Sequence, residues 1–176
     1  NLYTHSYLGF GLMSARKHIL LPSKNFSQET KSIIKLSSPC FSNLSPNQSV
    51  NWKFQHVIFE ISKVNSINSF EKCYKLAQDF VVNSIHKPEE IKDREIYLLS
   101  YYFDRMADVN VIQATDGIGF IKVKDYLLMA EEICNSKVKL DNQSPFLCLD
   151  LTYISALLHD GFGINWDKKL TVSLTC

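Results

Sequence analysis

SPFLCLDLTYISALLHDGFG, residues 144–163, is the segment from which the architecture of the chain is best worked out. Residues 145–159 are predicted to form a helix, because proline is tolerated at a helix start, where the missing N–H has no partner. Gly161 is expected to end this helix in the left-handed conformation, which glycine adopts without a steric penalty. We therefore expect a long helix and a glycine turn in this part of the chain.

Apolar spacing outward from this helix predicts further regular elements. The expected helices are residues 12–20, 70–85, 105–111 and 123–134. The expected strands are residues 2–8, 52–61 and 95–103, the last with a run typical of a strand covered on both faces. Asp104 is expected to cap the helix that follows it. Residues 21–51, rich in Ser, Asn and Pro, are expected to be irregular.

Strands that alternate with helices indicate an α/β fold whose mixed, partly parallel sheet is flanked by helices. We interpret the irregular segment and the strand after it as a hairpin-like insertion on the main sheet. Two compact glycine pairs, Gly9-Phe-Gly11 and Asp116-Gly-Ile-Gly119, match neither common phosphate-loop pattern and are predicted to be turns.

The composition of the 176 residues excludes several classes of protein. A formal net charge of +1 does not indicate binding to nucleic acid or to an anionic membrane, both of which favour strongly basic proteins. No apolar run approaches the ~18 residues that a membrane span requires.

The chain begins with Asn1 and not with the Met that opens a reading frame, so we interpret it as part of a larger precursor.

The cysteines and the glycosylation motifs favour an oxidising compartment. The five cysteines form no C-x-x-C pair and the histidines do not cluster near them, which argues against a zinc site. Their spacing leaves the disulfide connectivity open, and five buried free thiols are the alternative. Four Asn-X-Ser motifs begin at Asn25, Asn43, Asn47 and Asn142. Together these features favour the secretory lumen or the extracellular space.

Three stretches carry a resemblance to a known family: LYTHSYLGFGLMSAR at 2–16, SYYFDRMADV at 100–109, and the segment 144–163. In order and spacing they resemble the ectonucleoside triphosphate diphosphohydrolase, or apyrase, family, and most of all its soluble nucleoside diphosphatase branch, types five and six. The resemblance covers residues 1–164 as the C-terminal lobe of such an enzyme. We interpret residues 165–176 as a divergent tail and expect partial disorder there.

The resemblance implies a fold, a set of disulfides and a chemistry. The fold would be one lobe of the actin-like, ribonuclease-H-like ATPase superfold, in which two lobes flank a cleft for nucleotide and a divalent metal. The disulfides would be Cys40–Cys73 and Cys134–Cys148, with Cys176 left over. The chemistry would be hydrolysis of UDP or GDP to the nucleoside monophosphate and phosphate, with Ca²⁺ or Mg²⁺, in the endoplasmic reticulum or Golgi lumen or after secretion.

The chain departs from the family because it lacks the residues that handle phosphate. The two glycine-rich loops that begin with Asp, the catalytic Glu and the C-terminal Trp segment have no counterpart in it. We therefore expect no turnover by the chain alone and no metal ligands within it. Asp104, Asp108 and Asp116 could in principle share a metal ion, but a capping role for Asp104 is the simpler interpretation. The alternative function is a non-catalytic truncated isoform or fragment that acts as a binding module. The preferred nucleotide and the oligomeric state stay open.

The resemblance suggests one site within the chain, for the base of a nucleotide. An aromatic residue at the end of the strand stacks on the base in the family, which by position suggests Tyr102, with Tyr101 or Phe103 as register alternatives. The turn after the later helix adds Asp160 and Phe162. This place agrees with the rule that α/β folds bind ligands at the carboxyl ends of strands. The alternative is that these aromatic side chains belong to the core.

Overall fold

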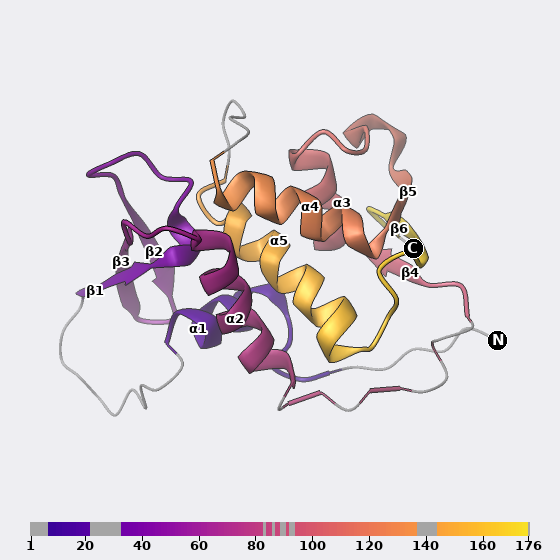
Figure 1. Ribbon diagram of the computed structural model, residues 1–176, viewed down its shortest axis with the longest axis horizontal. Helices are drawn as coiled ribbons and strands as arrows, with labels where there is room; N and C mark the ends of the chain where they lie inside the picture. The colour runs from indigo at the N-terminus through magenta and orange to yellow at the C-terminus, as the bar shows by residue number, and fades with distance from the viewer. Residues whose placement is uncertain are drawn as a thin grey trace.

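The computed structural model of the chain describes residues 7–21, 33–82, 84–85, 87–88, 91, 94–136 and 144–175. Within them a group of helices lies between two three-stranded sheets, sheet A at one end and sheet B at the other (Figure 1). Each sheet contains one parallel and one antiparallel pair of strands. The predicted α/β fold with a mixed sheet flanked by helices is thus confirmed as a class, but the structure has two such sheets, and the segment interpreted as an insertion on the main sheet forms sheet A by itself. The strand predicted at 2–8 lies almost wholly outside the described residues.

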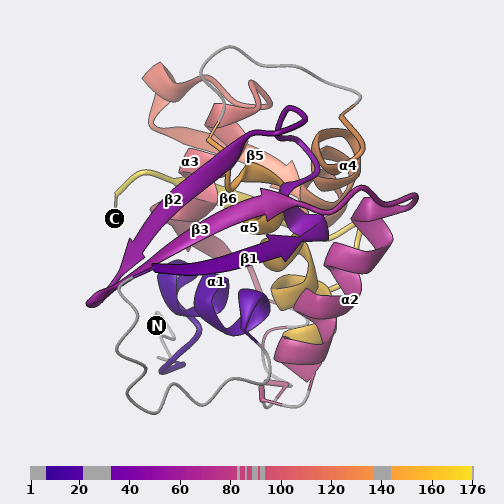
Figure 2. The same cartoon turned by 90° about the vertical axis from the view of Figure 1, so that its left-hand side faces the viewer.

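Sheet A has the strand order β1–β3–β2, formed by Ile33–Ser38, Val57–Lys63 and Ser49–Phe54. A 3-10 turn, Pro39–Phe41, follows β1. Figure 2 shows this sheet with α1 (Leu12–Leu20) and α2 (Ser69–Val82) beside it. The prediction of irregular structure through residue 51 is therefore wrong for β1 and for the start of β2. β1 pairs with β3 in parallel. The packing of its apolar side chains in this sheet outweighs the polar composition of the surrounding sequence, which favours irregular structure.

The single strand predicted at residues 52–61 is also wrong. The chain reverses at Gln55, which has φ +55°, so that Phe54 pairs with Val57 and Trp52 with Phe59. Directly paired residues of a hairpin lie on the same face of the sheet. Trp52 and Phe59, which a single alternating strand would place on opposite faces, therefore lie together in the core.

Sheet B has the strand order β4–β6–β5, formed by Tyr97–Leu99, Lys169–Ser173 and Ile118–Lys122. β6 lies in the stretch for which partial disorder is expected, yet it is the central strand of the sheet. Leu170 and Val172 of β6 are buried. The expectation of disorder after residue 164 is thus wrong, whereas the division of the chain at that residue stays a prediction.

The strand predicted at residues 95–103 is much shorter in the structure. β4 ends at Leu99, Ser100 takes φ +62°, and α3 (Tyr101–Asp108) begins at once. Asp104 therefore lies inside the helix and does not cap it, and Tyr97 is exposed instead of covered. A short apolar run does not distinguish a strand from a helix by its periodicity, which is the cause of the error.

The remaining helices follow the apolar spacing closely. α1 and α4 (Val123–Cys134) have the predicted bounds, and α2 ends at Val82, short of residue 85. α5 (Leu147–Ala156) is buried along its whole length and continues as a π-helical turn, Leu157–Gly161. In the part of the chain that the structure describes, no helix has the length and apolarity to cross a membrane.

The glycine turns agree with prediction at Gly9 and Gly117, but not at Gly119, which lies in β5 and pairs with Val172, nor at Gly161. Gly9, with φ +88°, and Gly117, with φ +68° after the 3-10 turn Ala114–Asp116, are turn residues, as expected. The left-handed stop after α5 is at Gly163, with φ +73°, and not at Gly161. Gly161 has a different reason to be small: a Cβ there would lie 3.1 Å from Cδ1 of Ile85.

Candidate functional site

Tyr101 and Tyr102 form the first turn of α3, directly after the carboxyl end of β4. Their rings stack with centroids 4.2 Å apart and an interplanar angle of 27°. Both side chains are half-buried. The pair lies in a helix and not in a strand, but it keeps the place where α/β folds bind ligands.

Two more tyrosines complete a group that we call the tyrosine cluster: Tyr101, Tyr102, Tyr126 of α4 and Tyr153 of α5. The Tyr126 hydroxyl donates to the backbone oxygen of Tyr102 at 2.7 Å, and the Tyr153 hydroxyl donates to the backbone oxygen of Phe10. Burial raises the pKa of all four phenols, and the neighbouring phenols raise it further at all of them except Tyr102. The cluster is therefore uncharged at neutral pH, and Tyr101 and Tyr102, its two half-buried members, present aromatic rings that do not repel an anion.

Phe103, the third aromatic residue of the predicted site, faces the core. Its side chain is only 2% exposed. Successive residues of an α-helix point about 100° apart, so Phe103 turns inward where Tyr101 and Tyr102 remain accessible. Of the three register alternatives, Tyr101 and Tyr102 keep partial exposure, and Phe103 does not.

Asp160 and Phe162 lie at and beyond the π-helical turn and are held by other elements. Asp160 accepts hydrogen bonds from the Tyr74 hydroxyl at 2.6 Å and from Gln78 Nε2 at 3.1 Å, both on α2. Burial, and then the hydrogen bond to Asp160, raises the pKa of Tyr74. The Phe162 ring lies against that of Tyr7, with centroids 5.1 Å apart. Within residues 94–136 and 144–175, no hydrogen bond, ion pair or ring contact joins them to the tyrosine cluster, so the predicted site residues form two groups.

Asp150 of α5 is a fully buried carboxylate that the sequence alone does not single out. Arg16 of α1 contacts it twice, Nε to Oδ1 at 2.8 Å and Nη2 to Oδ2 at 2.6 Å. Arg105 of α3 adds a contact from Nη1 to Oδ2 at 3.1 Å. The Arg16 guanidinium also lies over the Phe146 ring, 4.1 Å from its centroid. This network fastens α1 and α3 to α5. Its signal in the sequence is the lone acid of a buried helix, which needs a charged partner.

Comparison with known proteins assigns the chain to a family. The model of the GDA1/CD39 (nucleoside phosphatase) family matches residues 1–175. The chain belongs to the GDA1/CD39 family. This membership confirms the resemblance that the three motifs indicate, and the fold of the family is that of the actin-like ATPases. The match extends through β6 and thus through most of the stretch after residue 164.

Relatives within the GDA1/CD39 family are much longer than this chain. It is 38% identical to ectonucleoside triphosphate diphosphohydrolase 5 of Gallus gallus, over 98% of the chain and 39% of the relative. It is 37% identical to ectonucleoside triphosphate diphosphohydrolase 6 of Mus musculus, over 98% and 36%. It is 38% identical to nucleoside diphosphate phosphatase ENTPD5 of Homo sapiens, over 92% and 36%. The chain therefore spans less than two fifths of each of these relatives.

The described residues of this GDA1/CD39 chain do not fit a divalent cation. Asp108 pairs with Arg105 at 3.1 Å, and burial raises its pKa in spite of that charge. Where the structure describes the chain, the one group of His, Cys, Asp or Glu close enough to share an ion consists of Cys73, Cys134 and Cys148. Their sulfur atoms are bonded in disulfides and are not thiolate ligands.

The predicted disulfides are both present, Cys40–Cys73 and Cys134–Cys148. Of the glycosylation motifs, Asn47 is exposed in a turn with φ +64°, and Asn43 is partly buried. Asn25, Asn142 and Cys176 lie outside the described residues. Occupancy of these motifs stays a prediction.

Sheet B carries an open hollow of about 830 Å³ that the sequence did not indicate. Tyr97 and Phe120, which are 57% and 78% exposed, line it together with basic side chains. Two of these, Lys122 and Lys124, pair with Asp167 at 3.8 and 2.6 Å. The tyrosines of the cluster are not among the residues that line this hollow.

Proposed function

We propose that the chain is part of a nucleoside diphosphatase that hydrolyses UDP or GDP to the nucleoside monophosphate and phosphate. The observation that carries this proposal is the similarity to nucleoside diphosphate phosphatase ENTPD5 over 92% of the chain. Family membership over residues 1–175 supports it. No observation in the chain favours a non-catalytic binding module as the alternative.

Within that enzyme, the proposed role of the chain is to form the base side of the nucleotide cleft. Tyr101 and Tyr102 offer stacked, partly exposed rings at the carboxyl end of β4. Stacking of a base on an aromatic side chain contributes about 1–3 kcal/mol and tolerates any base, because every base has a π-face. The rings would therefore bind UDP and GDP alike and leave the choice between them to other contacts.

The phosphate chemistry is proposed to reside outside this chain. In the longer enzyme, Ca²⁺ or Mg²⁺ would supply the positive charge that offsets the phosphate groups and polarises the phosphoryl oxygen. In the described part of the chain no three Asp, Glu or His side chains lie close enough to share such an ion, and Asp150 and Asp108 are paired with arginines. The ligands of the ion and the base that activates water are therefore assigned to the remainder of the longer enzyme.

The proposed compartment is the lumen of the endoplasmic reticulum or Golgi, or the outside of the cell. Two disulfides in the described core support an oxidising environment. The exposed turn at Asn47 could carry an N-linked glycan there.

The test is phosphate release from UDP and GDP, with Ca²⁺ or Mg²⁺, by the chain and by a longer form that carries the rest of the family domain. We expect release by the longer form alone. Turnover by the chain itself would mean that a catalytic centre exists among residues assigned here to structure. Absence of release by the longer form from either nucleotide would overturn the proposed function.

A further inference from the structure

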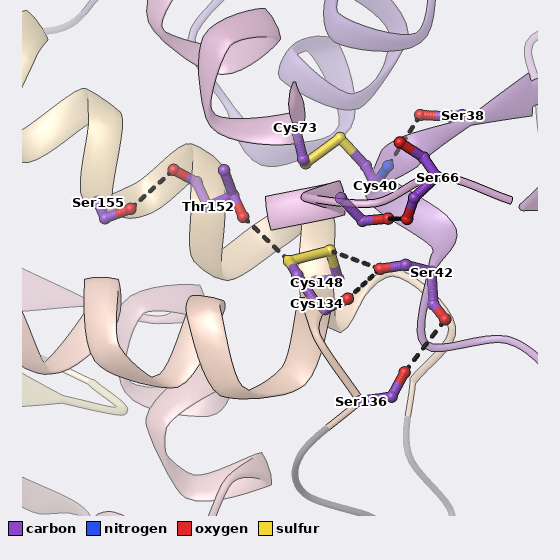
Figure 3. Close-up of a disulfide and its surroundings, with 11 residues drawn as sticks. Ser38, Cys40, Ser42, Ser66, Cys73, Cys134, Ser136, Cys148, Thr152 and Ser155 are labelled. Atoms are coloured by element: carbon purple, nitrogen blue, oxygen red, sulfur yellow. Dashed lines mark hydrogen bonds between the residues drawn. A yellow bond between two sulfur atoms is a disulfide. The ribbon is translucent and has the colours of Figure 1, made fainter. Parts of the chain in front are cut away.

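The two disulfides lie side by side in the core (Figure 3). The sulfur atoms of Cys73, Cys134 and Cys148 are all within 4.8 Å of one another, although Cys73 is bonded to Cys40. The four cysteines come from the 3-10 turn after β1, from α2, from α4 and from α5, and all are buried. Packing of these elements thus holds a third sulfur within reach of an existing disulfide.

The surroundings of the sulfurs distinguish Cys134 from Cys148. Thr152 Oγ1 lies 3.4 Å from Cys134 Sγ, and Thr152 is fully buried. A disulfide sulfur carries no proton, so the threonine hydroxyl is the donor. Ser42 Oγ lies 4.0 Å from Cys148 Sγ, but its proton is donated to the backbone oxygen of Cys134. Of the two sulfurs, Cys134 is therefore the one that a hydroxyl proton stabilises as a thiolate.

We propose that these sulfurs form a thiol–disulfide exchange relay in which Cys73, once released from Cys40, bonds to Cys148 and frees Cys134. The Cys73 thiolate attacks Cys148 Sγ, and the Cys73–Cys148 bond forms while the Cys134–Cys148 bond breaks. The electron pair leaves on Cys134, where Thr152 donates its hydrogen bond. The proton of the Cys73 thiol goes to solvent. One disulfide replaces another, so no oxidant or reductant is consumed.

The relay changes which elements are cross-linked. The bond between α4 and α5 is exchanged for one between α2 and α5, so two helices of the core remain joined. The 3-10 turn that carries Cys40, and with it the end of β1, is released. A small thiol such as glutathione that opens the bond at Cys40 therefore removes the covalent link between the end of β1 and α2, while the new disulfide joins α2 to α5.

The relay is tested in the chain with Cys40→Ser, which leaves Cys73 free, and with Cys176→Ser, which removes the remaining thiol. After incubation at about pH 8, where thiolate forms, the chain is quenched in acid, unfolded, alkylated and mapped by mass spectrometry. We expect the label on Cys134 and a Cys73–Cys148 disulfide. A label on Cys73 with the original bond intact overturns the relay, and a label on Cys148 overturns its direction.

Matched variants in the same background test the role of Thr152. Thr152→Val keeps the shape and removes the hydroxyl, so the ratio of label on Cys134 to label on Cys73 is expected to fall about tenfold. Ser155→Ala is the control, because that hydroxyl donates to the backbone oxygen of Thr152 and contacts no sulfur in the structure. An unchanged ratio in Thr152→Val contradicts the assignment of the donor.

A second measurement avoids the Cys40 substitution in case that variant does not fold. The unsubstituted chain is incubated in a glutathione redox buffer and mapped in the same way. We expect molecules with glutathione on Cys40 to contain a Cys73–Cys148 bond. If such molecules retain only the Cys134–Cys148 bond, the relay is contradicted.

Discussion

Replacement of Asp150 by Asn tests the buried ion network that joins three helices. The substitution keeps the size of the side chain and removes its charge, leaving the Arg16 guanidinium without its carboxylate and Arg105 with Asp108 as its remaining partner. Breaking a buried ion pair by removing one partner costs about 3–5 kcal/mol, because the other charge stays in the protein interior. We therefore expect a large loss of stability and no change in the fold class.

The exposure of the arginines sets the magnitude within that range. The side chains of Arg16 and Arg105 are 11% and 18% exposed, so water screens part of the unpaired charge. We accordingly expect the lower end, a loss of about 3 kcal/mol in the free energy of unfolding. For a protein of this size each kcal/mol lowers the melting temperature by about 2–4 °C, which gives a fall of about 6–12 °C.

The assay is urea unfolding followed by circular dichroism, together with calorimetry for the melting temperature. Asp167→Asn is the matched control, since Asp167 pairs with Lys124 at an exposed position, where solvent screens the pair, and its loss should change stability little. Arg16→Met should cost more than Arg105→Met, because Arg16 makes two contacts with Asp150 and one with a ring. If Asp150→Asn is no more harmful than Asp167→Asn, the network does not contribute as described.

Three further predictions concern the disulfides, the sheet and an exposed ion pair. Removing Cys40–Cys73, which closes 33 residues, should lower the free energy of unfolding by about 3.7 kcal/mol, and removing Cys134–Cys148, which closes 14, by about 3 kcal/mol. Urea unfolding measures both losses, and the reverse order would contradict the loop-entropy argument. Gly119→Ala should destabilise the chain by about 1–3 kcal/mol, because the added Cβ would lie 2.6 Å from Cγ2 of Ile112; an unchanged melting temperature counts against this contact. The hydrogen bond from Lys124 and its charge hold the pKa of Asp167 below its ordinary value, so the pair stabilises the fold above the unfolded pKa and the effect is lost as pH falls through the folded one. Nuclear magnetic resonance titration should show this depression and its decrease with salt; an ordinary value at low salt refutes it.

The parts of the fold that local patterns determine could be predicted from the sequence. α1 and α4 have the predicted bounds because apolar spacing and the flanking residues agree on them. The reversals at Gln55 and Ser100 could not be predicted, since neither is a glycine or an asparagine and both adopt positive φ. Pairing of β2 with β3 and of β4 with β6 imposes these conformations. No feature of the local sequence indicates that pairing.

The candidate site shows the same division between local and long-range information. The place of Tyr101 and Tyr102 followed from the resemblance, but their helical conformation and the burial of Phe103 did not. Asp150 stayed unassigned because its partners lie 134 and 45 residues away in the sequence. The disulfide pairing likewise needed the resemblance, because spacing alone admits several connectivities.

The most direct test of the proposed nucleotide site is the KM for UDP of Tyr101→Ala and Tyr102→Ala in the longer enzyme, beside Phe120→Ala as a control on sheet B. Loss of a stacking contact of about 1–3 kcal/mol should raise KM about 5- to 150-fold in at least one tyrosine variant, with a smaller change in kcat. Phe120→Ala should leave KM unchanged, since Phe120 is exposed in the hollow of sheet B and not in the tyrosine cluster. An unchanged KM in both tyrosine variants would remove the cluster from the nucleotide site and contradict the proposed role of the chain.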